Sequence, residues 1–124
     1  MTDFKDIKLN KQLFQAIENL GFDKQTPIQE HTFSKILSGN DLVGIAQTGT
    51  GKTIAYCLPL LQELIFSNQN NPRILILVPT RELVAQVVQT FNDLTEYISC
   101  RIVGVYGGTN MNTQKKMLQS GADI

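Results

Sequence analysis

The sequence lacks several features that would point to particular functions. It has no tryptophan, one histidine and two cysteines, Cys57 and Cys100, whose spacing matches no metal-binding motif. We therefore expect free thiols in a reducing cytoplasm, not a disulfide framework or a metal centre. The N-terminus has no apolar signal core, and the longest apolar stretch, residues 54–66, is too short and too interrupted to cross a bilayer. These absences predict a soluble cytoplasmic protein without membrane contact.

An excess of charge of one sign is also missing. The chain contains 11 Lys and Arg and 11 Asp and Glu, so its formal net charge is zero. No large positive field attracts nucleic acid from a distance, and any contact with a polyanion must come from local groups. At 124 residues, 42% of them hydrophobic, the chain is long enough for one small domain with one core.

The apolar pattern is helical in the first forty residues. One helix is expected after an Asn10 cap, with Gly21 at its end in the left-handed conformation. A second helix is expected after Thr26, with Pro27 in its first position and an end near Leu37.

From residue 41 the pattern alternates between short strands and helices. We expect strands at 42–46, 73–78 and 102–106 and the start of a fourth at 122–124, with helices at about 52–66, 81–97 and 110–119. The run at 73–78 (RILILV) is typical of a strand covered on both faces, and residues 42–46 are expected to form a buried strand. The order predicts an α/β fold with a parallel sheet. Loops 46–53, 79–81 and 107–110 should then share the carboxyl edge of the sheet, where ligands bind.

A glycine-rich loop between the first strand and its helix is the strongest functional signal. It consists of Ala46, Gln47, Thr48, Gly49, Thr50, Gly51, Lys52 and Thr53. Glycines allow backbone N–H groups to face a phosphate, and the following helix N-terminus adds favourable partial charge. Lys52 would reach the β- and γ-phosphates, and the Thr53 hydroxyl would hold Mg²⁺. A tight turn without a ligand is the alternative, and the lysine, the hydroxyl and the context together argue against it.

The residues before this loop indicate the base. The Gln29 amide can donate to adenine N7 and accept from the adenine amino group, whereas guanine offers acceptors at both places. The aromatic ring of Phe22 can stack on a base. Thr26 and Gln29 also fit a capping box, in which the glutamine bonds back to the helix start. The two interpretations do not exclude each other.

Two later segments are candidates for phosphate contacts. Pro79, Thr80 and Arg81 begin a helix at the expected rim, and Gly107 and Gly108 follow the third strand. A hydroxyl, a guanidinium and backbone N–H groups there could hold nucleic-acid phosphates. Taken alone, a helix cap with a solvated arginine and an ordinary glycine turn are the commoner meanings of these residues.

Together these segments resemble the motifs of the DEAD-box ATP-dependent RNA helicases. Residues 4–29, in which Phe4 stands upstream of GF and QTPIQ, resemble the Q motif, and residues 46–53 resemble the phosphate loop. Residues 79–86 resemble motif Ia, with Val84 where alanine is usual, and residues 107–108 resemble the glycine doublet. The amino-acid sequences of these motifs are most similar to those of bacterial RhlE-like members. The resemblance implies a three-layer RecA-like P-loop NTPase domain that binds ATP, Mg²⁺ and the RNA backbone, with Phe4 among the nucleotide contacts. It also implies ATP-driven local unwinding or remodelling of RNA.

The resemblance also indicates which parts of such a helicase are missing. The chain stops before the acidic D-E-A-D motif, the S-A-T motif and the second domain, so the sheet should be incomplete and residues 1–124 inactive alone. Two alternatives stay open at this point: a related helicase-superfamily ATPase acting on DNA, and a nucleotide-binding module without catalysis.

Overall fold

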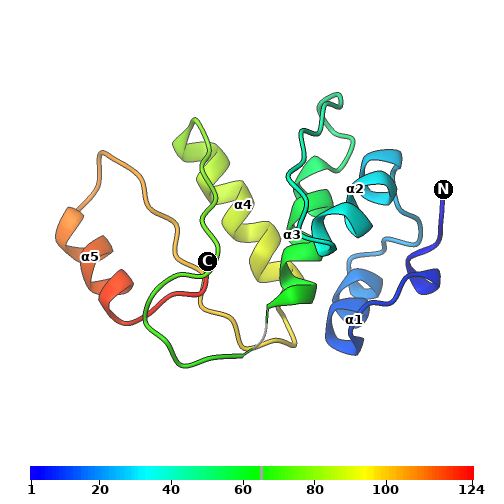
Figure 1. Cartoon of the computed structure of the whole chain (residues 1–124). Helices are drawn as coiled ribbons and strands as arrows, with labels where there is room; N and C mark the ends of the chain where they lie inside the picture. Colours follow the sequence, from blue (N-terminus) through cyan, green and yellow to red (C-terminus); the bar gives the residue numbers. More distant parts are fainter. Residues whose placement is uncertain (65) are drawn as a thin grey trace.

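The computed structural model describes residues 1–64 and 66–124. Its helical elements, in chain order, are η1 Phe4–Asp6, α1 Lys11–Asn19, α2 Pro27–Leu37, α3 Lys52–Glu63, α4 Arg81–Leu94 and α5 Met111–Gln119. α3 packs against α2 and α4, and α1 packs against α3 and α4. Figure 1 shows these four helices side by side, with α5 set apart at the end of long connections.

The helix starts are fixed by local side-chain caps. The Asn10 side chain accepts from the Leu13 N–H at 2.8 Å at the start of α1. Thr80 accepts from the Leu83 N–H at 3.2 Å at the start of α4, and Asn110 accepts from two N–H groups at the start of α5. Each cap satisfies a backbone donor that lacks an intrahelical partner.

Two helices end earlier than predicted. α3 ends at Glu63, before residue 66, and α4 ends at Leu94, before residue 97. At the end of α4 the buried Thr95 hydroxyl donates to the Phe91 carbonyl at 2.8 Å, which closes the last turn locally. Ile65, inside the predicted span of α3, lies outside the described residues.

One hydrophobic core lies between the first four helices. It contains Phe4, Leu13, Ile17, Phe33, Cys57, Leu58, Leu61, Val87, Phe91 and Leu94. Members come from η1, α1, α2, α3 and α4, so burial of this apolar surface holds the N-terminal helices to the two central ones.

The predicted sheet is not formed in the described part of the chain, where no strand is assigned. Val43 and Ile45 are 88% and 91% exposed, so the prediction of a buried first strand is wrong for this structure. Leu75 and Leu77 are 80% and 85% exposed, so segment 73–78 is covered on one face, not on both. The physical reason is the absence of neighbours, because a strand needs a partner at about 4.8 Å to pair its backbone.

The C-terminal residues 123–124 form backbone hydrogen bonds with two of the predicted strands, 73–78 and 102–106. The Arg73 N–H donates to the Asp123 carbonyl at 2.9 Å, and the Val103 N–H donates to the Ile124 carbonyl at 3.0 Å. Segments 74–78 and 102–105 then line a cleft of about 210 Å³ floored by α4. Within the described residues no backbone hydrogen bond crosses this cleft.

Candidate nucleotide and nucleic-acid site

Three loops on one side of the molecule hold the candidate site. Figure 1 shows loop 46–53, the N-terminus of α4 and loop 107–110 along its upper edge. The first loop leads into α3, the second into α4 and the third into α5. Three helix N-termini with their partial positive charge therefore share one side of the molecule.

The phosphate loop is exposed and held by its own backbone. Gly49 and Gly51 have φ of 80° and 81°, a conformation that other residues rarely adopt. The Thr50 hydroxyl donates to the Gln47 carbonyl at 2.6 Å. Lys52 Nζ donates to the carbonyls of Gln47, at 3.3 Å, and Ala46. In the described residues Lys52 has no acidic partner within 4.0 Å, so its charge is available to an anion.

Gln29 joins the start of α2 to this loop. Its side chain is buried, with Oε1 accepting from the Thr26 N–H at 3.0 Å and Nε2 donating to the Gly51 carbonyl at 3.2 Å. A Cβ on Gly51 would stand 2.4 Å from Gln29 Nε2 and would displace the glutamine amide, and the φ of 81° also favours glycine at this position. The capping role foreseen for Gln29 is therefore present, and its adenine contact stays a prediction.

The two aromatic candidates have different environments. Phe22 is 42% exposed, so its ring is available for stacking. Phe4 is 2% exposed and belongs to the hydrophobic core, and its N–H donates to the Asp23 carbonyl at 3.0 Å. The Phe4 ring thus packs in the core while its backbone holds Asp23, the residue after Phe22, and a contact between Phe4 and a nucleotide stays a prediction.

Lys52 and Thr53 line one end of a cleft of about 860 Å³ whose other walls are α2, the rest of α3 and the extended segment 40–44. Among the described residues no group of three or more His, Cys, Asp or Glu could hold a metal ion. A Mg²⁺ at the half-buried Thr53 would need its other ligands from phosphate oxygens and water, as Mg²⁺ commonly takes them.

The second part of the rim places a cation beside a glycine turn. Arg81 is exposed in the first turn of α4, and its Cζ lies 5.2 Å from the centre of the Tyr106 ring. Gly107 and Gly108 follow Tyr106, both are exposed, and a Cβ on either would meet nothing within 4 Å. Thr80 serves as the α4 cap, so its hydroxyl already accepts one hydrogen bond.

Two residues near the rim, Gln114 and Tyr106, were not predicted from the sequence. Gln114 is 9% exposed on α5, and its amide bonds the N–H and the carbonyl of Tyr106, both at 2.9 Å. It also donates to the Thr109 hydroxyl at 2.6 Å. A buried glutamine shortly after a glycine turn was the available signal, but its partners are set by the path of the loop.

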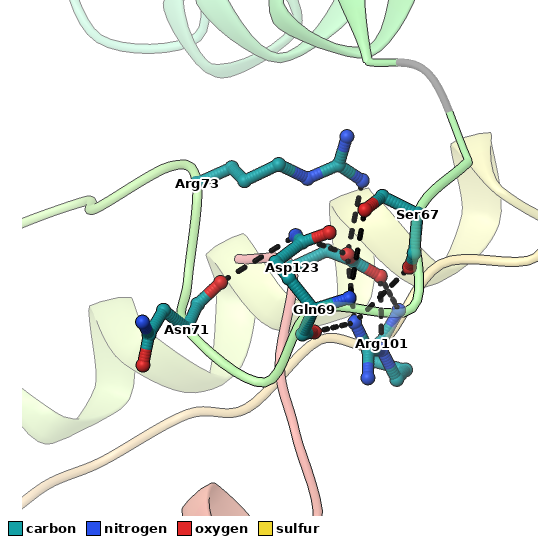
Figure 2. Close-up of polar contacts among 6 residues, drawn as sticks. All are labelled: Ser67, Gln69, Asn71, Arg73, Arg101 and Asp123. Carbon is teal, nitrogen blue, oxygen red and sulfur yellow. Dashed lines mark hydrogen bonds and ion pairs between the residues drawn. The ribbon is translucent and has the colours of Figure 1, made fainter.

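A polar cluster at the opposite end of the extended segments fixes the C-terminal residues (Figure 2). The Asp123 carboxylate binds the guanidinium groups of Arg73, at 3.0 Å, and Arg101, at 3.1 Å. Arg101 also donates to the carbonyls of Ser67 and Gln69, at 3.4 and 2.6 Å. Hydrogen bonding from Arg101 holds the pKa of Asp123 at about 2, below its ordinary 3.8.

The thiols are far from this chemistry. Cys57 is buried in the core, and burial raises the pKa of its thiol well above the ordinary value. Burial, with the nearby Asp123 charge, raises the pKa of Cys100 to about 11. Neither thiol is therefore ionised near neutral pH. None of the helices in the described ranges has the length and apolarity that crossing a membrane requires.

Comparison with known proteins gives concordant matches. The model of the DEAD/DEAH box helicase family matches residues 26–124. ATP-dependent RNA helicase DeaD of Escherichia coli strain K12 is 40% identical over an alignment that covers 99% of this chain and 20% of that protein. ATP-dependent RNA helicase CshA of Listeria monocytogenes is 40% identical over 100% of this chain and 24% of its own length. The chain thus spans between a fifth and a quarter of the length of these curated relatives.

Solved structures agree with the sequence comparison. The RNA helicase Prp28 from Chaetomium thermophilum, bound to ADP, superposes with a TM-score of 0.87 and 34% identity, over 99% of this chain and 31% of that chain. A DEAD box protein from Methanococcus jannaschii gives a TM-score of 0.86 and 32% identity, over 99% of this chain and 34% of that chain. The arrangement of the chain is thus that of DEAD-box helicase RecA-like domains, while its sheet is not formed here. The RhlE-like subgroup stays a prediction.

Proposed function

The chain belongs to the DEAD/DEAH box helicase family, and on that premise we propose that residues 1–124 are the ATP-binding part of an ATP-dependent RNA helicase. In this proposal the chain binds ATP at loop 46–53 and the RNA backbone along the rim, within the first of two RecA-like domains. The acidic motif and the second domain would complete the enzyme, which would remodel short RNA duplexes without regard to base sequence. Two unreactive thiols fit a reducing cytoplasm.

The observation that carries the proposal is the phosphate loop at the N-terminus of α3. Its two left-handed glycines, the close approach at Gly51 and an unneutralised Lys52 fit a polyanionic triphosphate. Lys52 would hold the β- and γ-phosphates, and Thr53 would hold Mg²⁺. That ion would neutralise charge on the phosphates during transfer. The capped start of α2, held to Gly51 by Gln29, keeps the loop in place for this role.

The adenine and RNA contacts complete the assignment. Gln29 and the exposed Phe22 lie on the segment that precedes the loop, and we assign them to the base. The phosphate contacts of RNA are assigned to Pro79, Thr80, Arg81 and the Gly107-Gly108 backbone. With a net charge of zero, these few groups would supply most of the RNA affinity.

The first experiment measures ATP affinity of residues 1–124 with a fluorescent ATP analogue and Mg²⁺. Lys52→Ala should weaken binding at least tenfold, because a charge-assisted contact to phosphate contributes about 1.5–3 kcal/mol. Lys35→Ala, at an exposed position of α2, is the matched control and should leave affinity unchanged. Equal binding by Lys52→Ala and the unmodified chain would rule out this loop as the nucleotide site.

The second experiment tests the enzymatic assignment. Residues 1–124 replace the matching segment of the Escherichia coli DeaD relative, and RNA-stimulated ATP turnover and unwinding of a short RNA duplex are measured. The chimera should be active, and Lys52→Ala should abolish turnover while circular dichroism shows an unchanged fold. A folded chimera that binds ATP but does not respond to RNA would contradict the helicase assignment.

A further inference from the structure

A contact between Arg81 and the Tyr106 ring connects two parts of the rim that are far apart in sequence. The Arg81 Cζ lies 5.2 Å from the ring centre, within the range of a cation–π contact. Arg81 is exposed, and in the described part of the chain it forms no ion pair. A guanidinium has five N–H donors, and a ring that contacts its carbon through the π face accepts none of them in a strong hydrogen bond, so they can still donate to an oxyanion.

The aromatic partner is itself fixed. The amide of the buried Gln114 donates to the Tyr106 carbonyl and accepts from the Tyr106 N–H, both at 2.9 Å. A side-chain amide offers the same donor and acceptor as a peptide group, so Gln114 pairs with Tyr106 as a neighbouring strand would. Its third bond, to Thr109, holds the far side of the Gly107-Gly108 turn. Tyr106 thus has a defined position although the sheet around it is not formed.

We propose that Tyr106 is a positioning residue for RNA binding: its ring holds the Arg81 guanidinium beside the Gly107-Gly108 backbone so that both can meet neighbouring phosphates of one strand. The inference rests on the proposed function and deepens it. Without the ring, the long Arg81 side chain would lose rotamer freedom on binding RNA, which opposes binding. With the ring, part of that freedom is already restricted in the free protein, which favours the contact.

The test is an RNA titration, at low salt, of the chimera in which residues 1–124 replace the matching segment of the DeaD relative, with two unrelated single-stranded oligonucleotides. Tyr106→Leu should weaken binding about two- to fivefold for both sequences, as expected for an exposed cation–π contact. Tyr106→Phe keeps the ring and should restore the affinity. Arg81→Ala should weaken binding roughly tenfold and lower the slope of affinity against salt by about one, whereas Tyr106→Leu should leave the slope unchanged.

The double variant separates positioning from direct contact. If Tyr106 acts through Arg81, adding Tyr106→Leu to Arg81→Ala should cause no further loss. Additive losses, or a loss that differs between the two RNA sequences, would mean that the ring stacks on a base itself, and would overturn the proposal. A loss in Tyr106→Phe equal to that in Tyr106→Leu would also overturn it, because the aromatic face would then be irrelevant.

A measurement without RNA guards against misfolding of the variants. The NMR signal of the Arg81 Nε–H should be displaced by the ring in the unmodified chain and in Tyr106→Phe, and return to its ordinary position in Tyr106→Leu while other amides stay in place. If Arg81→Ala leaves RNA affinity unchanged, the RNA role within the proposed function fails. If Arg81→Ala weakens binding and Tyr106→Leu does not, only the positioning role fails.

Discussion

Replacing Asp123 by asparagine should destabilise the chain in a pH-dependent way. The carboxylate is 5% exposed and binds Arg73 and Arg101, so its ionised form is stabilised in the folded state. Its pKa falls from 3.8 to about 2 on folding. A shift of one pKa unit corresponds to about 1.4 kcal/mol of stabilisation of the ionised form. The carboxylate should therefore contribute about 2 kcal/mol at pH 7, and Asp123→Asn should remove about that amount.

The pH profile follows from the sign of this displacement. Because the folded pKa lies below the unfolded one, the contribution is complete well above pH 4 and is lost as the pH falls towards 2. At pH 3 about half of it, roughly 1 kcal/mol, should remain. The difference between the unmodified chain and Asp123→Asn should therefore shrink on acidification.

Urea unfolding followed by circular dichroism at several pH values between 7 and 3 measures this difference. Asp41→Asn, at an exposed carboxylate after α2, is the matched control and should change stability by less than about 0.5 kcal/mol. An Asp123→Asn deficit that stays constant with pH would mean that packing, not charge, is lost. Equal stability at pH 7 would refute the contribution of the two arginine contacts.

Three further outcomes are expected. Gln29→Ala should weaken ATP more than GTP, by about 1–3 kcal/mol in competition against a fluorescent nucleotide, and equal losses would mean that Gln29 acts only as a cap. Gly104→Ala should cost about 1 kcal/mol in urea unfolding, because its Cβ would stand 2.9 Å from the Val88 side chain; unchanged stability would show that the segment can move away. Cys57 and Cys100 should react slowly with a thiol reagent at pH 8, since burial raises both pKa values, and free-thiol rates would contradict their burial.

The helices could be predicted because their signals are local. Asn10, Thr80 and Asn110 each cap a helix with bonds to residues two or three positions ahead, and the left-handed Gly21 follows the end of α1. The prediction of the sheet could not be made reliable in this way. Whether the segment with Leu75 and Leu77 forms a paired strand depends on neighbouring strands that only tertiary structure supplies. A continuous apolar run such as 74–78 therefore indicates the tendency to form a strand, not its pairing.

In the candidate site, too, the residues that are contiguous in sequence could be predicted, and those joined by tertiary contacts could not. The glycines and Lys52 of the phosphate loop are contiguous, so their pattern could be recognised from sequence alone. The amide of Gln114 and the ring of Tyr106 act on residues brought near by the loop path, and no spacing rule indicates them. The bond from Gln29 to Gly51 likewise joins positions that only the packing of α2 against α3 brings together.

The exposed extended segments around residues 43–45 and 75–77 have a consequence for the handling and expression of residues 1–124. Leu75 and Leu77 expose apolar side chains next to backbone donors and acceptors that no strand in the described part of the chain pairs, and Val43 and Ile45 do the same near α2. Such edges are templates for pairing between molecules. At high concentration the chain should therefore aggregate through intermolecular β-structure, and chaperones that bind extended apolar peptides should retain it. Charged substitutions at the outward positions 43, 45, 75 and 77 are the direct way to keep it dispersed.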